Sequence, residues 1–207
     1  MMENSPDIEV VDGTTFELRP WDRVPTNAEW VCLRKCRDYT NRYLELANEF
    51  RECRMVEVGV DQGGSTSFFL KLLKPERLVA IELSGKPVQT VTDFLAKHDP
   101  EGRVQIHWGI DQSDRSAVPH LLVQAFADRP LDPVIDDASH LLAPSTATFE
   151  MLFPRLRPGG LFVLEDWSGD HLVERALQRA LESDADGELA AEIAATVADK
   201  VSSLRHQ

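Results

Sequence analysis

Short apolar segments alternate with amphipathic ones from residue 55 onward, and this alternation constrains the fold more than any other feature of the sequence. The apolar segments predict strands at 55–60, 78–83, 104–108, 133–136 and 161–164. The segments between them predict helices at 65–73, 87–97, 116–127, 144–156 and 170–181, with a turn at 158–160. Strands that alternate with helices over short links form parallel sheets with right-handed crossovers. We therefore predict an α/β fold, a doubly wound, mostly parallel sheet that binds ligands at the carboxyl ends of its strands.

The residues before this alternation carry a different pattern. Residues 1–25 are polar with three prolines, which predicts a loose arm, and residues 26–54 have near-helical spacing, which predicts a helical cap. The chain then divides into an arm and cap over 1–54 and a ligand-binding catalytic domain over 55–207. Tyr39 and Tyr43 lie four residues apart, which favours a packed helix; a subunit contact in a homo-oligomer is the alternative.

Composition excludes several classes of protein. A length of 207 residues with 43% hydrophobic residues suits one folded domain. The net charge of -13 argues against nucleic acid or an anionic membrane as the partner. Three cysteines without a C-x-x-C pair predict free thiols in a reducing compartment and no zinc site. The polar first 20 residues and the absence of a long apolar run predict a cytoplasmic protein.

A glycine-containing loop joins the first predicted strand to its helix, in the stretch from Glu57 to Ser65. Gly59 permits a sharp turn, and Gly63 and Gly64 are expected to let the backbone approach a ligand closely. The spacing differs from the G-x-G-x-x-G of dinucleotide sites, and no lysine follows the glycines as in a P-loop. The loop therefore suits a ligand with no phosphate to bind.

A nucleoside is the ligand that the next acidic residue favours. Glu82 ends the second predicted strand, where its carboxylate can accept hydrogen bonds from both hydroxyls of a ribose. A solvated strand-end glutamate is the alternative, but the glycine loop at the usual interval before it favours ribose. Asp111 or Gln112, after the third strand, is expected to meet an adenine edge. Asp114 nearby has a second interpretation as a cap of the next helix.

Acidic residues also follow the fourth and fifth predicted strands. Asp137 comes after one strand with His140 three residues on, and Glu165 and Asp166 come after the other. If the strands are neighbours, these side chains converge as ligands for a hard divalent cation, with an imidazole as general base. Helix capping by Asp137 and Asp166 is the alternative.

These segments resemble the class I S-adenosylmethionine-dependent methyltransferases. The run Glu57-Val58-Gly59 with Gly63 resembles their first motif, and Glu82 resembles their ribose-binding acid. A narrower resemblance lies in the runs I-D-D-A-S-H, G-I-D-Q-S-D, L-R-P-G-G and E-D-W, at residues 135–140, 109–114, 156–160 and 165–167, together with Phe149. It is to the metal-dependent O-methyltransferases that act on sugar hydroxyls of macrolide antibiotics, with the related cephalosporin-hydroxylase-type proteins.

The resemblance implies a role for each of these residues. S-adenosylmethionine is the implied cofactor, with Glu82 on its ribose and residues 59–64 under its methionine part. The other residues that the resemblance assigns to the cofactor are Glu57, Ser65, Asp111, Gln112 and Asp136. It implies that Asp137, Glu165 and Asp166 bind Mg²⁺ and that His140 is the general base. Two departures are an extra acid, Asp61, in the glycine loop and no evident closing β-hairpin after residue 182.

The favoured hypothesis is a Mg²⁺-dependent O-methyltransferase that acts on a hydroxyl of a sugar or polyhydroxylated natural product. The partner is then a small-molecule hydroxyl acceptor, and Trp167 is expected to form an apolar wall beside it, with a place in the core as the alternative. A cofactor-binding scaffold that keeps the fold without methylation is a second hypothesis. A nicotinamide-dependent enzyme is a third, which the glycine spacing disfavours.

Overall fold

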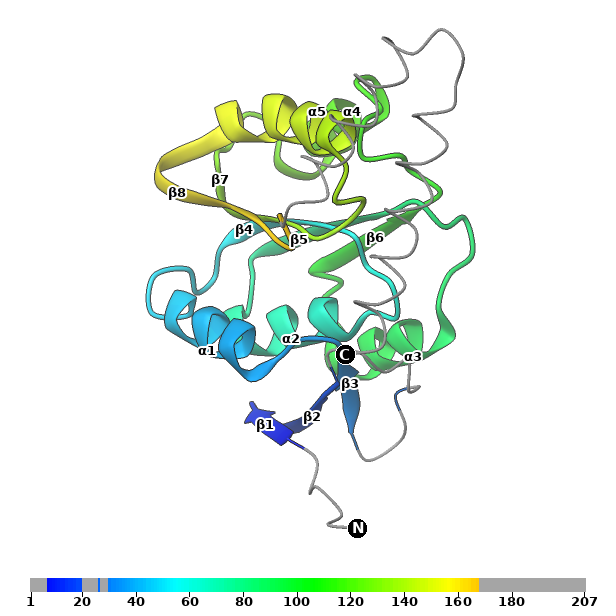
Figure 1. Ribbon diagram of the computed structural model, residues 1–207, viewed down its shortest axis with the longest axis vertical. Helices are drawn as coiled ribbons and strands as arrows, with labels where there is room; N and C mark the ends of the chain where they lie inside the picture. Colours follow the sequence, from blue (N-terminus) through cyan, green and yellow to red (C-terminus); the bar gives the residue numbers. More distant parts are fainter. Residues whose placement is uncertain (1–6, 20–25, 27–29, 168–207) are drawn as a thin grey trace, which may run out of the picture.

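A five-stranded parallel sheet lies at the centre of the computed structural model, which describes residues 7–19, 26 and 30–167 (Figure 1). Its strands are β4 (Arg54–Val58), β5 (Arg77–Glu82), β6 (Val104–Trp108), β7 (Leu131–Asp136) and β8 (Leu156–Leu164). They are arranged in the order β6-β5-β4-β7-β8. The predicted parallel α/β sheet is confirmed.

Helices cover both faces of this sheet. They are α1 (Arg37–Leu46), α2 (Gly64–Leu73), α3 (Gln89–His98), α4 (Ala117–Phe126) and α5 (Leu142–Leu152), which runs into a 3-10 turn at Phe153–Arg155. Figure 1 shows α1, α2 and α3 on one face and α4 and α5 on the other. Neighbouring residues of a strand point to opposite faces, so Met55 packs in the core on the α2 side while Val56 packs in the core on the α4 side.

The strand order places two loops at the point where the chain changes direction across the sheet. From β4 the chain adds β5 and β6 on one side, and then β7 and β8 on the other. Pairing continues just past the strand ends: Gly59 N–H donates to the Ile81 carbonyl at 2.9 Å, and Asp137 N–H donates to the Val58 carbonyl at 2.8 Å. The loops after β4 and β7 therefore diverge from adjacent strands, the arrangement that forms a ligand crevice in such sheets.

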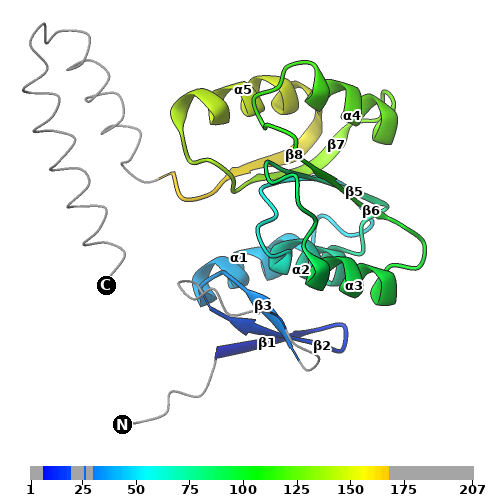
Figure 2. The same ribbon diagram turned by 90° about the vertical axis from the view of Figure 1, so that its right-hand side faces the viewer.

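In the described residues, the structure corrects the predicted loose arm over 1–25 and moves the start of the predicted helical cap over 26–54. Strands β1 (Asp7–Val11), β2 (Thr14–Leu18) and β3 (Val31–Leu33) form a second, small sheet, and α1 begins only at Arg37. Figure 2 shows this sheet on the outer side of α1 and α2, away from the large sheet. Phe16 is fully buried with its ring 5.1 Å from that of Phe68 on α2. Tertiary packing against α2 therefore decides a strand conformation that local spacing did not reveal.

The predicted turn at 158–160 was also wrong, because these residues lie inside β8. The pairing of β8 with β7 is irregular at this point: Leu131 pairs with Leu156, and Pro133 pairs with Leu161. A β-carbon on Gly160 would lie 2.8 Å from the Asp132 carbonyl oxygen, so the bulged strand passes close to its neighbour.

Other expectations concern the cysteines and the end of the chain. Cys32, Cys36 and Cys53 are free thiols, as predicted. The predicted helix at 170–181, the Ala-rich tail and the question of the closing hairpin lie outside the described residues. Within the described part of the chain, no helix is both long and apolar enough to cross a bilayer.

Candidate functional site

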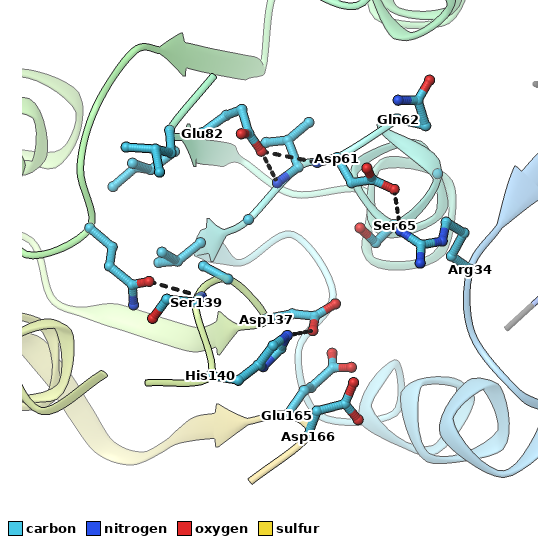
Figure 3. A pocket seen from close by; sticks show the side chains of 18 of the residues that line it. Arg34, Asp61, Gln62, Ser65, Glu82, Asp137, Ser139, His140, Glu165 and Asp166 are labelled. Atoms are coloured by element: carbon cyan, nitrogen blue, oxygen red, sulfur yellow. Dashed lines mark hydrogen bonds and ion pairs between the residues drawn. The ribbon is translucent and has the colours of Figure 1, made fainter. Parts of the chain in front are cut away.

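A cavity of about 710 Å³ opens at the carboxyl ends of β4, β5, β7 and β8, where the residues before α1 also border it. Two groups of predicted site residues line it. The first group is Gly59, Gly64, Ser65, Glu82, Asp111 and Gln112, and the second is Asp137, His140, Glu165 and Asp166. Figure 3 shows Asp137, His140, Glu165 and Asp166 together on one side, with Glu82, Asp61 and Ser65 across the cavity.

Three predicted cofactor residues lie behind the cavity wall instead of on it. Glu57 is 1% exposed and accepts a hydrogen bond from the Thr66 hydroxyl at 2.7 Å. Asp136 is equally buried, and burial raises the pKa of each of these two carboxyls to about 7. Gly63 packs against Val91, where a β-carbon on the glycine would lie 2.3 Å from the valine β-carbon. These residues shape the loop and do not face the cavity.

The glycines of the loop after β4 are needed for contact within the chain. Gly59 has φ of +93°, and a β-carbon there would lie 2.2 Å from the carbonyl oxygen of Asp137. A β-carbon on Gly64 would lie 2.1 Å from the Cys32 carbonyl oxygen at β3. Gly63 lies away from the cavity, with Val91 beside it, so its expected close approach to a ligand is corrected. Gly64 borders the cavity, and its close approach to a ligand stays a prediction.

Glu82 ties the end of β5 to this loop. One carboxylate oxygen accepts hydrogen bonds from the backbone N–H groups of Val60 and Asp61 at 2.9 and 3.0 Å, and the other accepts from Ser84 N–H at 2.8 Å. An ionised carboxylate has about four acceptor positions, so one remains for a ligand hydroxyl. The extra acid of the loop, Asp61, pairs with Arg34 at 2.6 Å.

Gln112 connects the loop after β6 to the loop after β7. Its amide nitrogen donates to the Asp136 carboxylate and to the Thr148 hydroxyl, and its amide oxygen accepts from Ser139 N–H at 3.0 Å. The amide group is thus engaged by protein partners although the residue borders the cavity. Its evident role is to orient the loop that carries His140.

The neighbouring aspartates form local turns. Asp111 accepts hydrogen bonds from the backbone N–H and the hydroxyl of Ser113. Asp114 accepts from the N–H groups of Ser116 and Ala117 at the start of α4, as the capping interpretation expects.

Asp137, His140 and Asp166 form the most compact group of candidate metal ligands in the described residues. Each offers one ligand atom, and these atoms lie within 4.8 Å of one another. His140 Nε2 lies 3.8 Å from Asp137 Oδ1, while its buried Nδ1 has no hydrogen-bond partner among the described residues. The predicted convergence of acids from β7 and β8 with His140 is thus present in the structure.

The backbone at this group is unusual. His140 and Asp166 have φ of +55° and +50°, in the left-handed region that non-glycine residues seldom adopt. His140 follows Asp137 by three residues, but this segment is not helical, since α5 begins only at Leu142. A left-handed turn, and not a helix, therefore brings the imidazole back toward Asp137. Such conformations cost free energy and concentrate at functional sites.

Local sequence patterns do not reveal a buried lysine, Lys35, or the hydrogen bonds of Tyr39 and Tyr43 to the acids. The ammonium of Lys35, which is 7% exposed, binds both Asp137 and Glu165, the latter at 2.5 Å. The Tyr43 hydroxyl donates to Glu165, and the Tyr39 hydroxyl donates to Asp166 at 2.9 Å. Lys35, Tyr39 and Tyr43 are spaced four apart, but Lys35 lies before the start of α1, so helical spacing places only the two tyrosines on one helix face.

Electrostatics at this network follow from burial and charge. Burial acts to lower the pKa of Lys35, but Glu165 and Asp137 together raise that pKa above its ordinary value. Burial raises the pKa of Glu165, with Lys35 acting in the opposite direction. Burial, with Glu165 beside it, likewise raises the pKa of Tyr43, so the hydroxyl keeps its proton and acts as a donor.

The donor atoms fit a divalent cation. Asp137 and Asp166 offer carboxylate oxygens, the ligands that Mg²⁺ prefers, and His140 offers an imidazole nitrogen beside them. Glu165 borders the same cavity, but both of its oxygens are bonded to Lys35 and Tyr43. The predicted set of three acids is therefore present at one cavity, and each acid already accepts a hydrogen bond from Lys35, Tyr39 or Tyr43.

Trp167 does not line this cavity, and its exposure contradicts the alternative of a place in the core, while the wall beside the acceptor stays a prediction. It is 46% exposed and borders a separate groove of about 300 Å³ with Phe149 and Phe162.

Comparisons with known proteins identify the family. Residues 56–167, more than half of the chain, match the family model described as a methyltransferase domain, and the chain belongs to this family. It is 49% identical over 175 residues to the L-olivosyl-oleandolide 3-O-methyltransferase of Streptomyces antibioticus, an alignment that covers 77% of this chain and 42% of that protein. It is 39% identical over 85 residues to the mycinamicin VI 2''-O-methyltransferase of Micromonospora griseorubida, covering 33% and 21%.

The solved structures agree with this family at the level of the fold. An O-methyltransferase from Bacillus cereus in complex with S-adenosylhomocysteine superposes with a TM-score of 0.53 at 17% identity, covering 82% of this chain and 73% of that one. The chain spans less than half the length of the two curated relatives described above.

Proposed function

We propose that this chain transfers a methyl group from S-adenosylmethionine to a hydroxyl of a sugar or polyhydroxylated natural product, with Mg²⁺ required and His140 as the general base. The observation that carries the proposal is the meeting of Asp137, His140 and Asp166 on the same cavity as the glycine loop and Glu82. Methyl transfer needs a site for the methyl donor next to a site for the hydroxyl acceptor. The glycine loop with Glu82 is proposed as the first, and Asp137, His140 and Asp166 are proposed as the second.

The half of the cavity at β4 and β5 is the proposed site of S-adenosylmethionine. Glu82 has an acceptor position left for a ribose hydroxyl, and the loop over residues 59–65 would lie beside the methionine part. Asp111, which borders the cavity beyond Glu82, would meet the adenosine end. A crevice at the point where strand order reverses is the general location for such ligands.

The chemistry requires an oxygen to attack a methyl carbon in line with the breaking bond to sulfur. The acceptor's hydroxyl proton leaves, and the sulfonium becomes a neutral thioether. An alcohol does not ionise near neutral pH, so the site needs a base, and a neutral imidazole is suited to that task. The position of His140 beside Asp137, with 3.8 Å between Nε2 and Oδ1, supports its assignment as this base.

Asp137 and Asp166 are the residues that would hold Mg²⁺, with either Glu165 or His140 as a third ligand. When bound, such a cation supplies Lewis acidity that lowers the pKa of a hydroxyl. Asp137 also accepts a bond from Lys35, and Asp166 accepts one from Tyr39, so both carboxylates are held in place from the N-terminal side.

The relatives support the class of acceptor. Their names describe methylation of hydroxyls, on an olivosyl macrolide in one case and on mycinamicin VI in the other. Because the present chain covers less than half of each, its own acceptor is part of the proposal.

A labelled-methyl assay on glycosylated natural products, with and without Mg²⁺, tests the proposal. We expect Mg²⁺-dependent product that EDTA abolishes, while calorimetry shows S-adenosylhomocysteine binding and no NAD binding. Asp137→Ala should abolish transfer and leave S-adenosylhomocysteine affinity nearly unchanged. Turnover that survives EDTA would show that the metal assignment is wrong, and NAD binding without the thioether nucleoside would remove the whole proposal.

A further inference from the structure

Lys35 lies in the segment between β3 and α1, beside the candidate metal-binding acids Asp137, Glu165 and Asp166. Its ammonium is ion-paired with both Asp137 and Glu165, and the side chain is 8% exposed. A single charged nitrogen in contact with two carboxylates from different strands occupies the kind of place that a metal ion takes between such groups.

Because of this pairing, Glu165 has no oxygen free of hydrogen bonds within the chain. One of its oxygens is bonded to Lys35 and the other to Tyr43, both from the N-terminal segment. With Lys35 in place, the compact set of ligand atoms is Asp137, His140 and Asp166, which includes a nitrogen. Mg²⁺ prefers an all-oxygen set, and Glu165 would complete one if Lys35 moved away.

We infer that Lys35 is a built-in competitor for the divalent cation: a metal reaches Asp137 and Glu165 together only by displacing the lysine ammonium. The inference rests on the metal site of the proposed function. A cation and the ammonium repel one another at this range, and both gain from the same two carboxylates. The long flexible stem of lysine allows the head group to swing toward the adjoining cavity, which Lys35 already borders.

Two effects follow from this competition. Without metal, Lys35 offsets the repulsion between Asp137 and Glu165 and keeps the two strand ends together. With metal, the same charge weakens binding, so the affinity for the cation is lower than the acids alone would provide. Removal of the lysine charge should therefore tighten metal binding while making the metal-free protein less stable.

Direct binding of Mn²⁺ to the full chain, followed by electron paramagnetic resonance, tests the inference. We expect Lys35→Met, which keeps the length and removes the charge, to bind Mn²⁺ at least about tenfold more tightly, the scale of one charge at close range. Lys35→Arg keeps the charge and should bind no more tightly than the wild type. Lys74→Met removes a lysine that pairs with Asp12 far from the cavity and should leave Mn²⁺ affinity unchanged. Equal or weaker binding by Lys35→Met would overturn the inference.

A measurement on the wild type covers the case in which Lys35→Met fails to fold. Acetylation of Lys35 by an amine-reactive ester, quantified by mass spectrometry against Lys71 of the same sample, should become faster on addition of Mg²⁺, because the displaced amine enters the cavity. An unchanged or slower rate would overturn the inference. Neither measurement uses turnover, so an inactive protein in which Lys35→Met tightens Mn²⁺ binding would count against the proposed function alone.

Discussion

Gly59 and Asp137 lie in contact at the ends of β4 and β7, so closely that a β-carbon on Gly59 would lie 2.2 Å from the Asp137 carbonyl oxygen. Gly59 belongs to the loop proposed for the cofactor, and Asp137 belongs to the group of candidate metal ligands. The two halves of the candidate site are therefore joined by direct backbone packing, and a side chain added at Gly59 should displace Asp137.

The first prediction follows from this contact. Gly59→Ala should destabilise the protein by about 3 kcal/mol or more, because it adds a steric clash with backbone to the strain of a positive φ. It should also reduce methyl transfer through displacement of Asp137. Urea denaturation with a transfer assay measures both effects.

Two other glycines provide a graded control. Gly102 has φ of +64° with open space around it, so Gly102→Ala should cost only about 1 kcal/mol of strain. Gly85 has neither constraint, and Gly85→Ala should be nearly neutral. Equal losses of unfolding free energy in all three variants would show that the contact with Asp137 does not add to the cost of Gly59→Ala.

The second prediction concerns the base. His140→Ala should lower the rate of methyl transfer about 10²–10⁴-fold, the usual contribution of general base catalysis. If His140 acts as the base and not as a metal ligand, His140→Ala should weaken Mn²⁺ binding by no more than about threefold. Loss of a metal ligand would weaken it much more. His120→Ala, on the exposed side of α4, is the matched control. A loss below tenfold would assign the base to another group.

The third prediction concerns the cofactor. Glu82→Gln places an amide where three backbone N–H groups now meet a carboxylate, so the loop after β4 loses its anchor. S-adenosylhomocysteine affinity should fall at least about tenfold by calorimetry, since a lost charged hydrogen bond costs about 1.5–3 kcal/mol. Glu76→Gln, whose carboxylate pairs with Arg54 and Arg129 away from the cavity, should bind normally.

The fourth prediction uses the buried carboxyl of Glu57, whose pKa burial raises to about 7. As pH rises above the ordinary value near 4.5, the unfolded chain loses this proton first, so folding stability falls until about pH 7 and then levels off. Glu57→Gln removes this penalty. Its stability relative to wild type should therefore improve by about 2 kcal/mol between pH 5.5 and pH 8.

Urea denaturation of wild type and Glu57→Gln at the two pH values measures that difference. The lost or altered hydrogen bond with Thr66 shifts both values equally and cancels. A stability difference that does not change with pH would mean that Glu57 is ionised at a normal pH in the folded protein.

Much of the large sheet was predictable because its signals are local. Short apolar runs bounded by turn residues gave strands 104–108 and 133–136 close to β6 and β7, and the helical spacing over 116–127 gave α4 to within a residue at each end. The order of the strands required tertiary structure, because β4 pairs with β5 and with β7, and nothing in the local pattern distinguishes these partners.

The structure of the N-terminal region could not be predicted from local sequence signals. Val31, Cys32 and Leu33 are buried as a strand because β2 and α2 lie against them, not because their own sequence demands it. The same packing sets Lys35 over Asp137 and Glu165, which lie 102 and 130 residues away in the chain. A lysine in a helical pattern ordinarily predicts a solvated side chain.

The sequence by itself determined the alternation of strands and helices, the acids at the ends of two strands, and the glycines of the first loop, because strand and helix periods and turn chemistry are properties of neighbouring residues. Tertiary structure alone decided which groups pair with these acids. Lys35 binds Asp137 and Glu165, and the hydroxyls of Tyr43 and Tyr39 donate to Glu165 and Asp166. Asp137 and Asp166 also lie beside His140. The reason is that charge pairing depends on distance in space, and these distances are set only when the N-terminal segment packs onto the carboxyl edge of the sheet.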